Sequence, residues 1–282
     1  MRGIVISPQV DIIEKNRMIV RNSNIDQEKL REYVMYWDQI DFPVNQILHF
    51  GDTPETDYLV KAQVMKRSKI NLQMSGELVE LFLKGQLEAF RINNANNPGS
   101  WSLAQSGSEL VLPQSSTIMT RNLEIELYNC LPVPKGDVSL DDILNFKEVR
   151  NDELLEFRQL IDDIYLEIIN SGDHERALVK NIENIKRKII ELNKIMDESR
   201  ISRAAKSLKI EFDVKDIISN GAMGFLIAQG SEYPIELGMA AGALFSAIKI
   251  SSEISIQPKE IPPELKGYAY LHYSHKELGV EL

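Results

Sequence analysis

The clearest hydrophobic pattern in the chain is a pair of apolar seams in its second half. Apolar residues recur at alternating steps of three and four over residues 154–168, and again over residues 178–196. This spacing is typical of long amphipathic helices whose buried stripe follows a heptad, as in a coiled coil. Because a short Gly-containing break at residues 171–173 separates the two seams, we expect a long antiparallel helical hairpin over residues 139–206.

The two arms of this expected hairpin carry opposite net charge. Residues 139–171 contain nine acidic and three basic residues, whereas residues 172–206 contain six acidic and nine basic residues. Opposite charges beside adjacent seams favour pairing of the arms with each other over self-association of either arm. An arm of about 30 residues would approach about 45 Å in length. The hairpin therefore either projects as a partner-binding arm or lies across the rest of the protein.

The first 138 residues alternate between strand and helix patterns. Residues 3–7 form a short β-branched run that ends at Pro8, as expected of a buried strand. Asp26 is a candidate N-cap for a helix that stops before Pro43. Parallel strands need crossover helices, so the alternation predicts an α/β body over residues 1–138, with a mixed sheet and flanking helices. The other elements expected there are extended segments at 46–50 and 68–72, helices at 56–65 and 75–90, and short strands at 109–112, 116–119 and 123–128.

A polar stretch at residues 93–107 interrupts this alternation. Its Asn, Gly, Pro and Ser content is typical of an exposed loop. We interpret it as a connection between elements, and a substrate-covering lid around Trp101 is the alternative.

The last part of the chain, residues 207–282, forms a third segment after the body and the hairpin. Alternating apolar and polar residues predict strands at 208–212 and 268–273, and the second of these would return to the N-terminal sheet. Between them, residues 217–250 are rich in Gly and Ala, which predicts one or two tightly packed helices broken near Pro234.

Composition limits the class of partner and the location. The formal charge of −10 and the pI near 5.1 have the wrong sign for a nucleic-acid-binding surface. The single cysteine, Cys130, cannot form an intramolecular disulfide and is expected to be a buried packing residue. The first residues lack the apolar stretch of a secretion signal, which favours a cytoplasmic protein. Polar and charged residues interrupt residues 217–250, so no stable membrane span is expected.

Several short motifs together suggest a family. The chain resembles a family of uncharacterised bacterial proteins that is known only as a domain of unknown function. The resemblance implies a bacterial origin and a complete, single-unit protein, and it transfers no catalytic residue. The motifs that carry it are GIVISP at 3–8, YWDQIDFP at 36–43, LPVP at 131–134, FKEVRNDELLEFR at 146–158 and YAYLHY at 268–273.

Two carboxylates are the best candidates for chemistry. Asp38 and Asp41 lie where a helix gives way to a strand, and loops at strand ends are where α/β folds place their sites. Together they could hold a divalent metal or act as an acid and base pair, with ligands added by His49, His272 or His275. The alternative is that both carboxylates terminate a helix and that the histidines are unrelated. The chain contains no nucleotide-binding or hydrolase motif, so the sequence favours no particular cofactor.

Three cations near the start of the acidic arm are candidates for partner binding. Lys147 and Arg150 share a helix face at a spacing of three, and Arg158 follows two turns later. They could grip a phosphate or a carboxylate of a partner, and salt bridges to nearby acids are the alternative.

These observations favour a protein-interaction or scaffolding component of a bacterial accessory system, for example anti-phage defence, with a protein partner or homo-oligomer. One alternative is a metal-assisted hydrolase that uses Asp38, Asp41 and a histidine. Another is a toxin-like effector that inserts residues 217–250 into a membrane, although Glu232 and Glu236 would be costly there.

Overall fold

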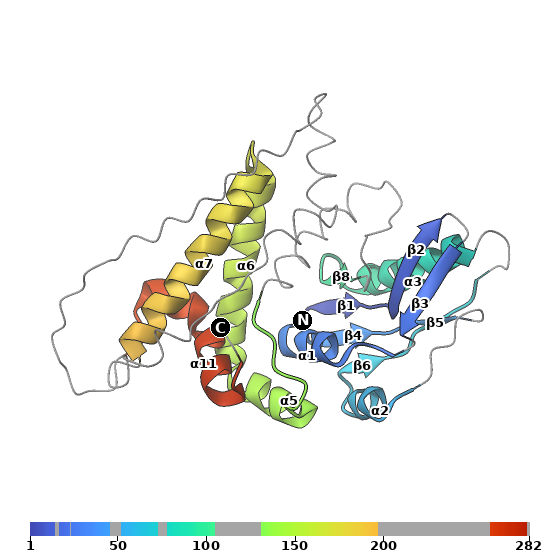
Figure 1. Ribbon diagram of the computed structural model, residues 1–282, viewed down its shortest axis with the longest axis horizontal. Helices are drawn as coiled ribbons and strands as arrows, with labels where there is room; N and C mark the ends of the chain where they lie inside the picture. Colours follow the sequence, from blue (N-terminus) through green and yellow to red (C-terminus); the bar gives the residue numbers. More distant parts are fainter. Residues whose placement is uncertain are drawn as a thin grey trace.

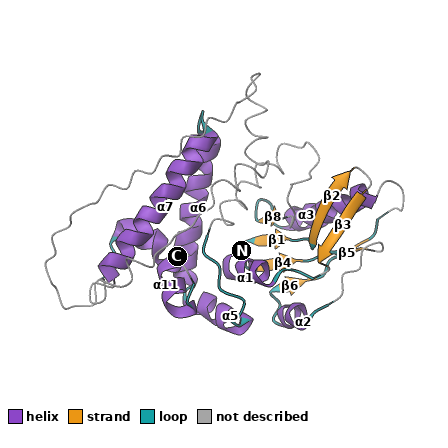
Figure 2. Ribbon diagram, viewed as in Figure 1, coloured by secondary structure: helices purple, strands orange, loops and turns teal. Residues whose placement is uncertain are grey.

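The protein combines a small parallel sheet with two groups of helices, so the predicted α/β fold class is confirmed (Figures 1 and 2). The expected elements at 46–50, 109–128, 208–212 and 217–250 lie outside the described residues, as does Cys130. The computed structural model describes residues 1–14, 17–22, 24–45, 52–72, 78–104, 131–196 and 260–280.

The central sheet has four parallel strands in the order β6-β4-β1-β8. The chain builds outwards from β1 to β4 and β6 through α1 and α2, and α3 then returns it to β8 on the other side of β1. The crossover helices expected between parallel strands are therefore present. The bounds of these elements are β1 (Gly3–Val5), α1 (Gln27–Tyr36), β4 (Gln39–Asp41), α2 (Pro54–Lys61), β6 (Met65–Lys66), α3 (Leu78–Asn96) and β8 (Trp101–Leu103).

Two short strand pairs complete the sheet region. β5 (Val44–Asn45) and β7 (Lys69–Ile70) pair in parallel and continue the β4·β6 ladder past Pro43. β2 (Gln9–Glu14) and β3 (Arg17–Asn22) form an antiparallel hairpin inserted between β1 and α1.

The two faces of the sheet are covered by different helices, because successive side chains of a strand point to opposite faces. Ile4 belongs to a large core cluster that includes α1, whereas Val5 packs in a smaller cluster with Trp101 and with Ala89 of α3. The Trp101 ring lies directly on Gly3, where a Cβ atom would overlap it. Glycine at this position therefore lets the ring cover the strand.

Local signals explain where the helices of this region begin. The Asp26 carboxylate accepts from the N–H groups of Glu28 and Lys29, so the predicted cap of α1 is confirmed. Thr53 and Thr56 form a capping box ahead of α2.

The helical part contains α5 (Leu140–Val149), α6 (Asn151–Asn170) and α7 (His174–Met196), followed by the short η1 (Pro263–Tyr268) and α11 (Ala269–Leu278). α6 and α7 lie side by side, joined by residues 171–173 (Figure 1). η1 and α11 pack against both of them. The seam residues are buried in one cluster and are Leu154, Phe157, Ile161, Ile164 and Ile168 of α6 and Leu178, Ile182, Ile185, Ile189 and Leu192 of α7.

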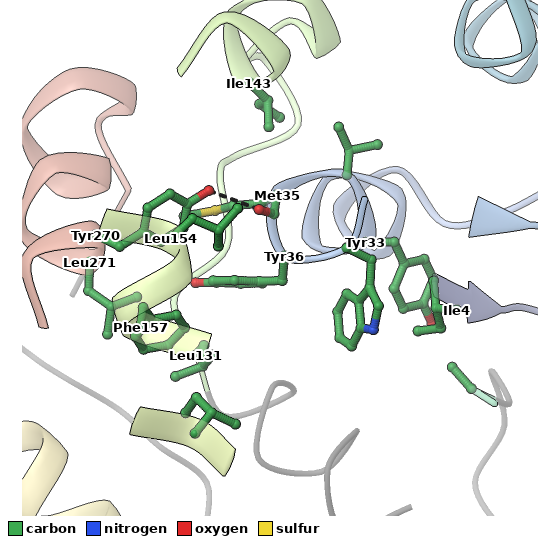
Figure 3. Close-up of a cluster of buried hydrophobic side chains, with 14 of the residues drawn as sticks. Ile4, Tyr33, Met35, Tyr36, Leu131, Ile143, Leu154, Phe157, Tyr270 and Leu271 are labelled. Atoms are coloured by element: carbon green, nitrogen blue, oxygen red, sulfur yellow. Dashed lines mark hydrogen bonds between the residues drawn. The ribbon is translucent and has the colours of Figure 1, made fainter. Parts of the chain in front are cut away.

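One hydrophobic core joins the sheet region to the helical part. Tyr36 of α1 packs against Phe157 of α6 and Tyr270 of α11, with ring centroids 6.0 and 6.2 Å away (Figure 3). The Tyr270 hydroxyl donates to the Met35 carbonyl oxygen at 2.8 Å, and the Tyr36 hydroxyl donates to the Pro132 carbonyl oxygen at 2.7 Å. These contacts link residues that are more than 90 positions apart in sequence.

The predicted strand at residues 268–273 is wrong, because the chain there is the end of η1 and the start of α11. Ala269, Tyr270, Leu271 and His272 are all buried, so the first turn of the helix is covered on every side, whereas Lys276 and Glu277 further along are exposed. A helical turn that is buried all round shows no 3.6-residue period, and the alternation of its residues imitates a strand.

The predicted loop at residues 93–107 is also partly wrong. α3 extends to Asn96, and Trp101 lies in β8, where it is buried in the core instead of covering a site. The strand has only three residues, which is too short for a period of two to be recognised among its polar neighbours.

Candidate functional site

Asp38 joins the start of β4 to helix α6. Its carboxylate accepts two hydrogen bonds from the Arg158 guanidinium, at 2.8 and 3.0 Å, and one from the backbone N–H of Arg2 at 2.7 Å. Arg158 also donates to the Tyr36 carbonyl oxygen at 2.7 Å. Burial by itself raises the pKa of the Asp38 carboxyl, but Arg158 and Arg2 outweigh it and hold the pKa below its usual value. Asp38 is therefore an ionised partner in a structural ion pair.

Lys147 of α5 lies beside this ion pair. Its ammonium donates a hydrogen bond to the Trp37 carbonyl oxygen. The side chain keeps some exposed surface, but desolvation of its ammonium, reinforced by Arg158 and opposed by Asp38, lowers the pKa of Lys147 to about 7. Lys147 thus shares the Asp38 carboxylate with Arg158 and with the N-terminal ammonium, which is 3.9 Å from it.

We expect Lys147 to make the stability of the protein depend on pH. Between the folded pKa of about 7 and the ordinary value of 10.5, the unfolded chain holds a proton on Lys147 that the folded chain has released. The free energy of unfolding therefore rises with pH in this range, by up to about 1.4 kcal/mol per unit, and this dependence ends below pH 7, where both states are protonated. Lys147→Met removes this contribution.

Urea unfolding at pH 7.5 and 9.5 measures this effect as a difference between proteins. From the lower to the higher pH, the unaltered protein is expected to gain about 2 kcal/mol more than Lys147→Met does. Lys180→Met, at an exposed lysine, is the control and should keep the slope of the unaltered protein. Equal slopes for Lys147→Met and Lys180→Met would contradict the assignment.

Arg150 connects the junction of α5 and α6 to α11. Its guanidinium pairs with Glu277, pairs with Glu153 at 3.1 Å and lies over the Tyr273 ring, 3.7 Å from its centroid. Lys147, Arg150 and Arg158, which were predicted to bind a partner, are therefore all engaged inside the molecule. Their contacts correspond to the alternative of intramolecular interactions: Arg150 pairs with the nearby Glu153, whereas Glu277 and Asp38, which pair with Arg150 and Arg158, are distant in sequence.

Asp41 lies at the other end of β4, under α3. Its buried carboxylate accepts from the N–H and the hydroxyl of Ser68, at 3.2 and 2.7 Å, and from the Asn93 side-chain amide at 2.7 Å. Lys66 Nζ is 3.9 Å from the carboxylate and 4.6 Å from the centroid of the Trp101 ring. The carboxyl ends of parallel strands are the usual place for a site in such a fold, but here the donors surrounding Asp41 bind α3 to the sheet.

The predicted metal ligands do not meet in the described part of the chain. Asp38 and Asp41 lie at opposite ends of β4 and contact different helices. His272 is buried beside Asn193, with 2.5 Å between its Nδ1 and the amide oxygen, and Nδ1 of His275 is 2.6 Å from the Val280 carbonyl oxygen. His49 lies outside the described residues. Among the described residues, no group of three or more His, Cys, Asp and Glu side chains could hold a metal ion.

The outward faces of α6 and α7 form a surface that sequence reasoning missed. On α6, the exposed residues at steps of three and four are acidic, amide-bearing or leucine, and we call them the α6 stripe. On α7, exposed residues at steps of three, four or seven are mostly basic, and we call them the α7 stripe. The α6 stripe is Asp152, Leu155, Glu156, Gln159, Asp163, Leu166, Glu167 and Asn170, and the α7 stripe is Arg176, Lys180, Glu183, Arg187 and Lys194.

The two stripes border one open groove near the turn between the helices. The groove has a volume of about 680 Å³, and its walls include Asp163 and Leu166 from α6 and Arg176 from α7. Glu167 and Lys180 form an ion pair across it at 2.8 Å. Leu155 and Leu166 are 52% and 53% exposed, although each lies on a helix whose other leucine and isoleucine side chains are largely buried. Two leucines outside the seam are the sequence signal that could have revealed this surface.

Comparison with known proteins identifies a family for this chain but no biochemical activity. No curated protein and no solved structure gives a significant match to the chain. Within the described residues, no helix is long and apolar enough to cross a membrane, and the predicted insertion segment, residues 217–250, lies outside them. The model of a family of unknown function matches residues 16–279, which agrees with the resemblance inferred from the motifs. The chain therefore belongs to the family of unknown function DUF6236.

Proposed function

We propose that this protein acts through protein–protein contacts and that the α6 stripe, with the groove beside it, is the docking surface. The observation that carries the proposal is the pair of half-exposed leucines, Leu155 and Leu166, on a face that otherwise holds four acids, two amide side chains and no base. Apolar side chains framed by charges of one sign are typical of surfaces that bind a partner of opposite charge.

The helices under this surface are held firmly, which favours recognition. The seam of α6 packs against α7 and the C-terminal helices, and Arg158 ties α6 to Asp38 of the sheet region. A surface that is already ordered loses little conformational entropy when a partner binds.

Such a role corresponds to an interaction or scaffolding component of a bacterial accessory system in the cytoplasm, of which anti-phage defence is one example. The alternative of a metal-assisted hydrolase gains no support from the described residues, because the carboxylates of Asp38 and Asp41 are bound by Arg158 and Asn93, respectively.

Site-specific photo-crosslinking tests the docking surface in cells. A photoreactive phenylalanine at position 155 or 166 is expected to form a discrete adduct, because both side chains reach solvent within the stripe. The same residue at Val60 of α2 or Ile92 of α3, which are also exposed apolar positions, is the matched control. The adduct should disappear when Glu156 and Asp163 are both replaced by lysine.

The result that would refute this proposal is a crosslinking pattern at positions 155 and 166 that equals the pattern at 60 and 92. An adduct that persists after the two charge reversals would also refute it, because capture would then not depend on the chemistry of the stripe.

A further inference from the structure

The groove between α6 and α7 has walls of opposite charge. The α6 stripe carries four acids and no base, and the α7 stripe carries four bases and one acid. Both stripes face outwards on the same side of the helix pair, since residues from each border the same groove. A surface of this kind is complementary to itself after a half-turn rotation.

We propose that the occupant of this surface is a second copy of the chain. In the dimer, the α6 stripe of each copy lies on the α7 stripe of its partner, around a twofold axis parallel to the helices. This inference rests on the proposed function and identifies the partner of the same surface. A twofold arrangement forms both acidic–basic contacts at once, so no charged stripe is left against a stripe of its own sign.

The position of the ion pair within one copy sets the alignment between copies. Glu167 and Lys180 are level with each other across the groove, and a twofold axis parallel to the helices preserves such levels. Counting along both helices from this pair places Arg187 within about one turn of Asp163 and of Glu156 in the opposite copy. The same count places Glu183, the one acid of the α7 stripe, beside Asp163, so Arg187 has to offset this like-charge contact. Arg187 is therefore the central cation of each contact.

The two exposed leucines of each copy would be covered by the partner's α7 stripe in this dimer. The α7 stripe contains no apolar residue, but the aliphatic stems of Lys180 and Lys194 offer apolar surface beneath their charged ends. The same counting places Leu166 beside the stem of Lys180 and Leu155 beside the stem of Lys194 in the opposite copy. Two helices of about 30 Å, side by side, cover roughly 600 Å² per copy, which is at the lower end for specific interfaces. The dimer should accordingly weaken as salt concentration rises.

Complementary charge reversal tests the dimer. One variant carries Glu156→Lys and Asp163→Lys on the α6 stripe, and the other carries Arg176→Glu and Arg187→Glu on the α7 stripe. Each variant alone would place like charges on both contacts, so its dimer dissociation constant should rise at least about tenfold. An equimolar mixture restores both contacts, because the basic α6 stripe then meets the acidic α7 stripe and the unaltered stripes meet each other. The measurement is sedimentation equilibrium of the full chain at low and high salt.

The outcomes separate this inference from the proposed function. The unaltered chain should approach twice 32.1 kDa at low salt and move towards 32.1 kDa at high salt. A chain that stays monomeric, or variants whose mixture does not regain the dimer, would overturn the second copy as partner. If crosslinks from positions 155 and 166 then reach a different protein, the docking surface stands and only its occupant changes. Circular dichroism of each variant confirms that both fold.

Discussion

Phe157→Ala is expected to lower the free energy of unfolding by about 3–5 kcal/mol. Phe157 is fully buried where α1, α6 and α11 meet, with the Tyr270 ring stacked on it at a centroid distance of 6.0 Å (Figure 3). The Tyr36 ring lies at the same distance on another helix. Removing the ring leaves a cavity that three separate helices line, and such a cavity cannot collapse without moving one of them.

Urea denaturation measures this loss, with Val149→Ala as the control because Val149 is 71% exposed. The control should change stability by about 0.5 kcal/mol or less. Since Phe157 belongs to a core cluster shared by the sheet region and the helices, tryptophan fluorescence and circular dichroism should report the same transition midpoint. A loss as small as that of the control would show that the junction is loosely packed.

The fold was predictable where burial follows a simple period. The seams of α6 and α7 are buried along their whole length. A helix with one buried face carries apolar residues at steps of three and four, so its sequence shows which face is buried. Asp26 and the β-branched run of β1 gave equally local signals. Prediction failed for α11 and β8, because a helical turn buried on every side and a strand of three residues have no period to detect.

The candidate site was less predictable because its contacts join distant parts of the chain. Asp38 and Arg158 were both recognised as candidate residues, but their separation by 120 positions leaves no pattern that would pair them. From the sequence, Asp38 was a candidate metal ligand and Arg158 a candidate partner-binding residue, and structural contacts were the alternative for both. In the structure each satisfies the other. The neutral form of Lys147 is favoured mainly by desolvation of its ammonium, with Arg158 adding to this effect and Asp38 opposing it.

Asp38→Ala is expected to lower the free energy of unfolding by about 3–5 kcal/mol, because it leaves Arg158 without its anion in a largely buried position. Lys147 loses the carboxylate that favours its charged form, so its pKa should fall below about 7. Asp162→Ala is the matched control, since Asp162 pairs with Arg2 but is 51% exposed, and exposed pairs contribute little.

The double variant Asp38→Ala/Arg158→Met separates the value of the ion pair from the penalty of an orphaned charge. Methionine fills much of the volume of arginine and needs no anion, so the double variant should be more stable than Asp38→Ala alone even though it has lost one more native side chain. That order of stabilities follows only if the two groups act on each other. If the losses from Asp38→Ala and Arg158→Met simply add, Asp38 and Arg158 are independent, and the attachment of α6 to the sheet must come from other contacts, such as the aromatic junction and the Arg2–Asp162 pair.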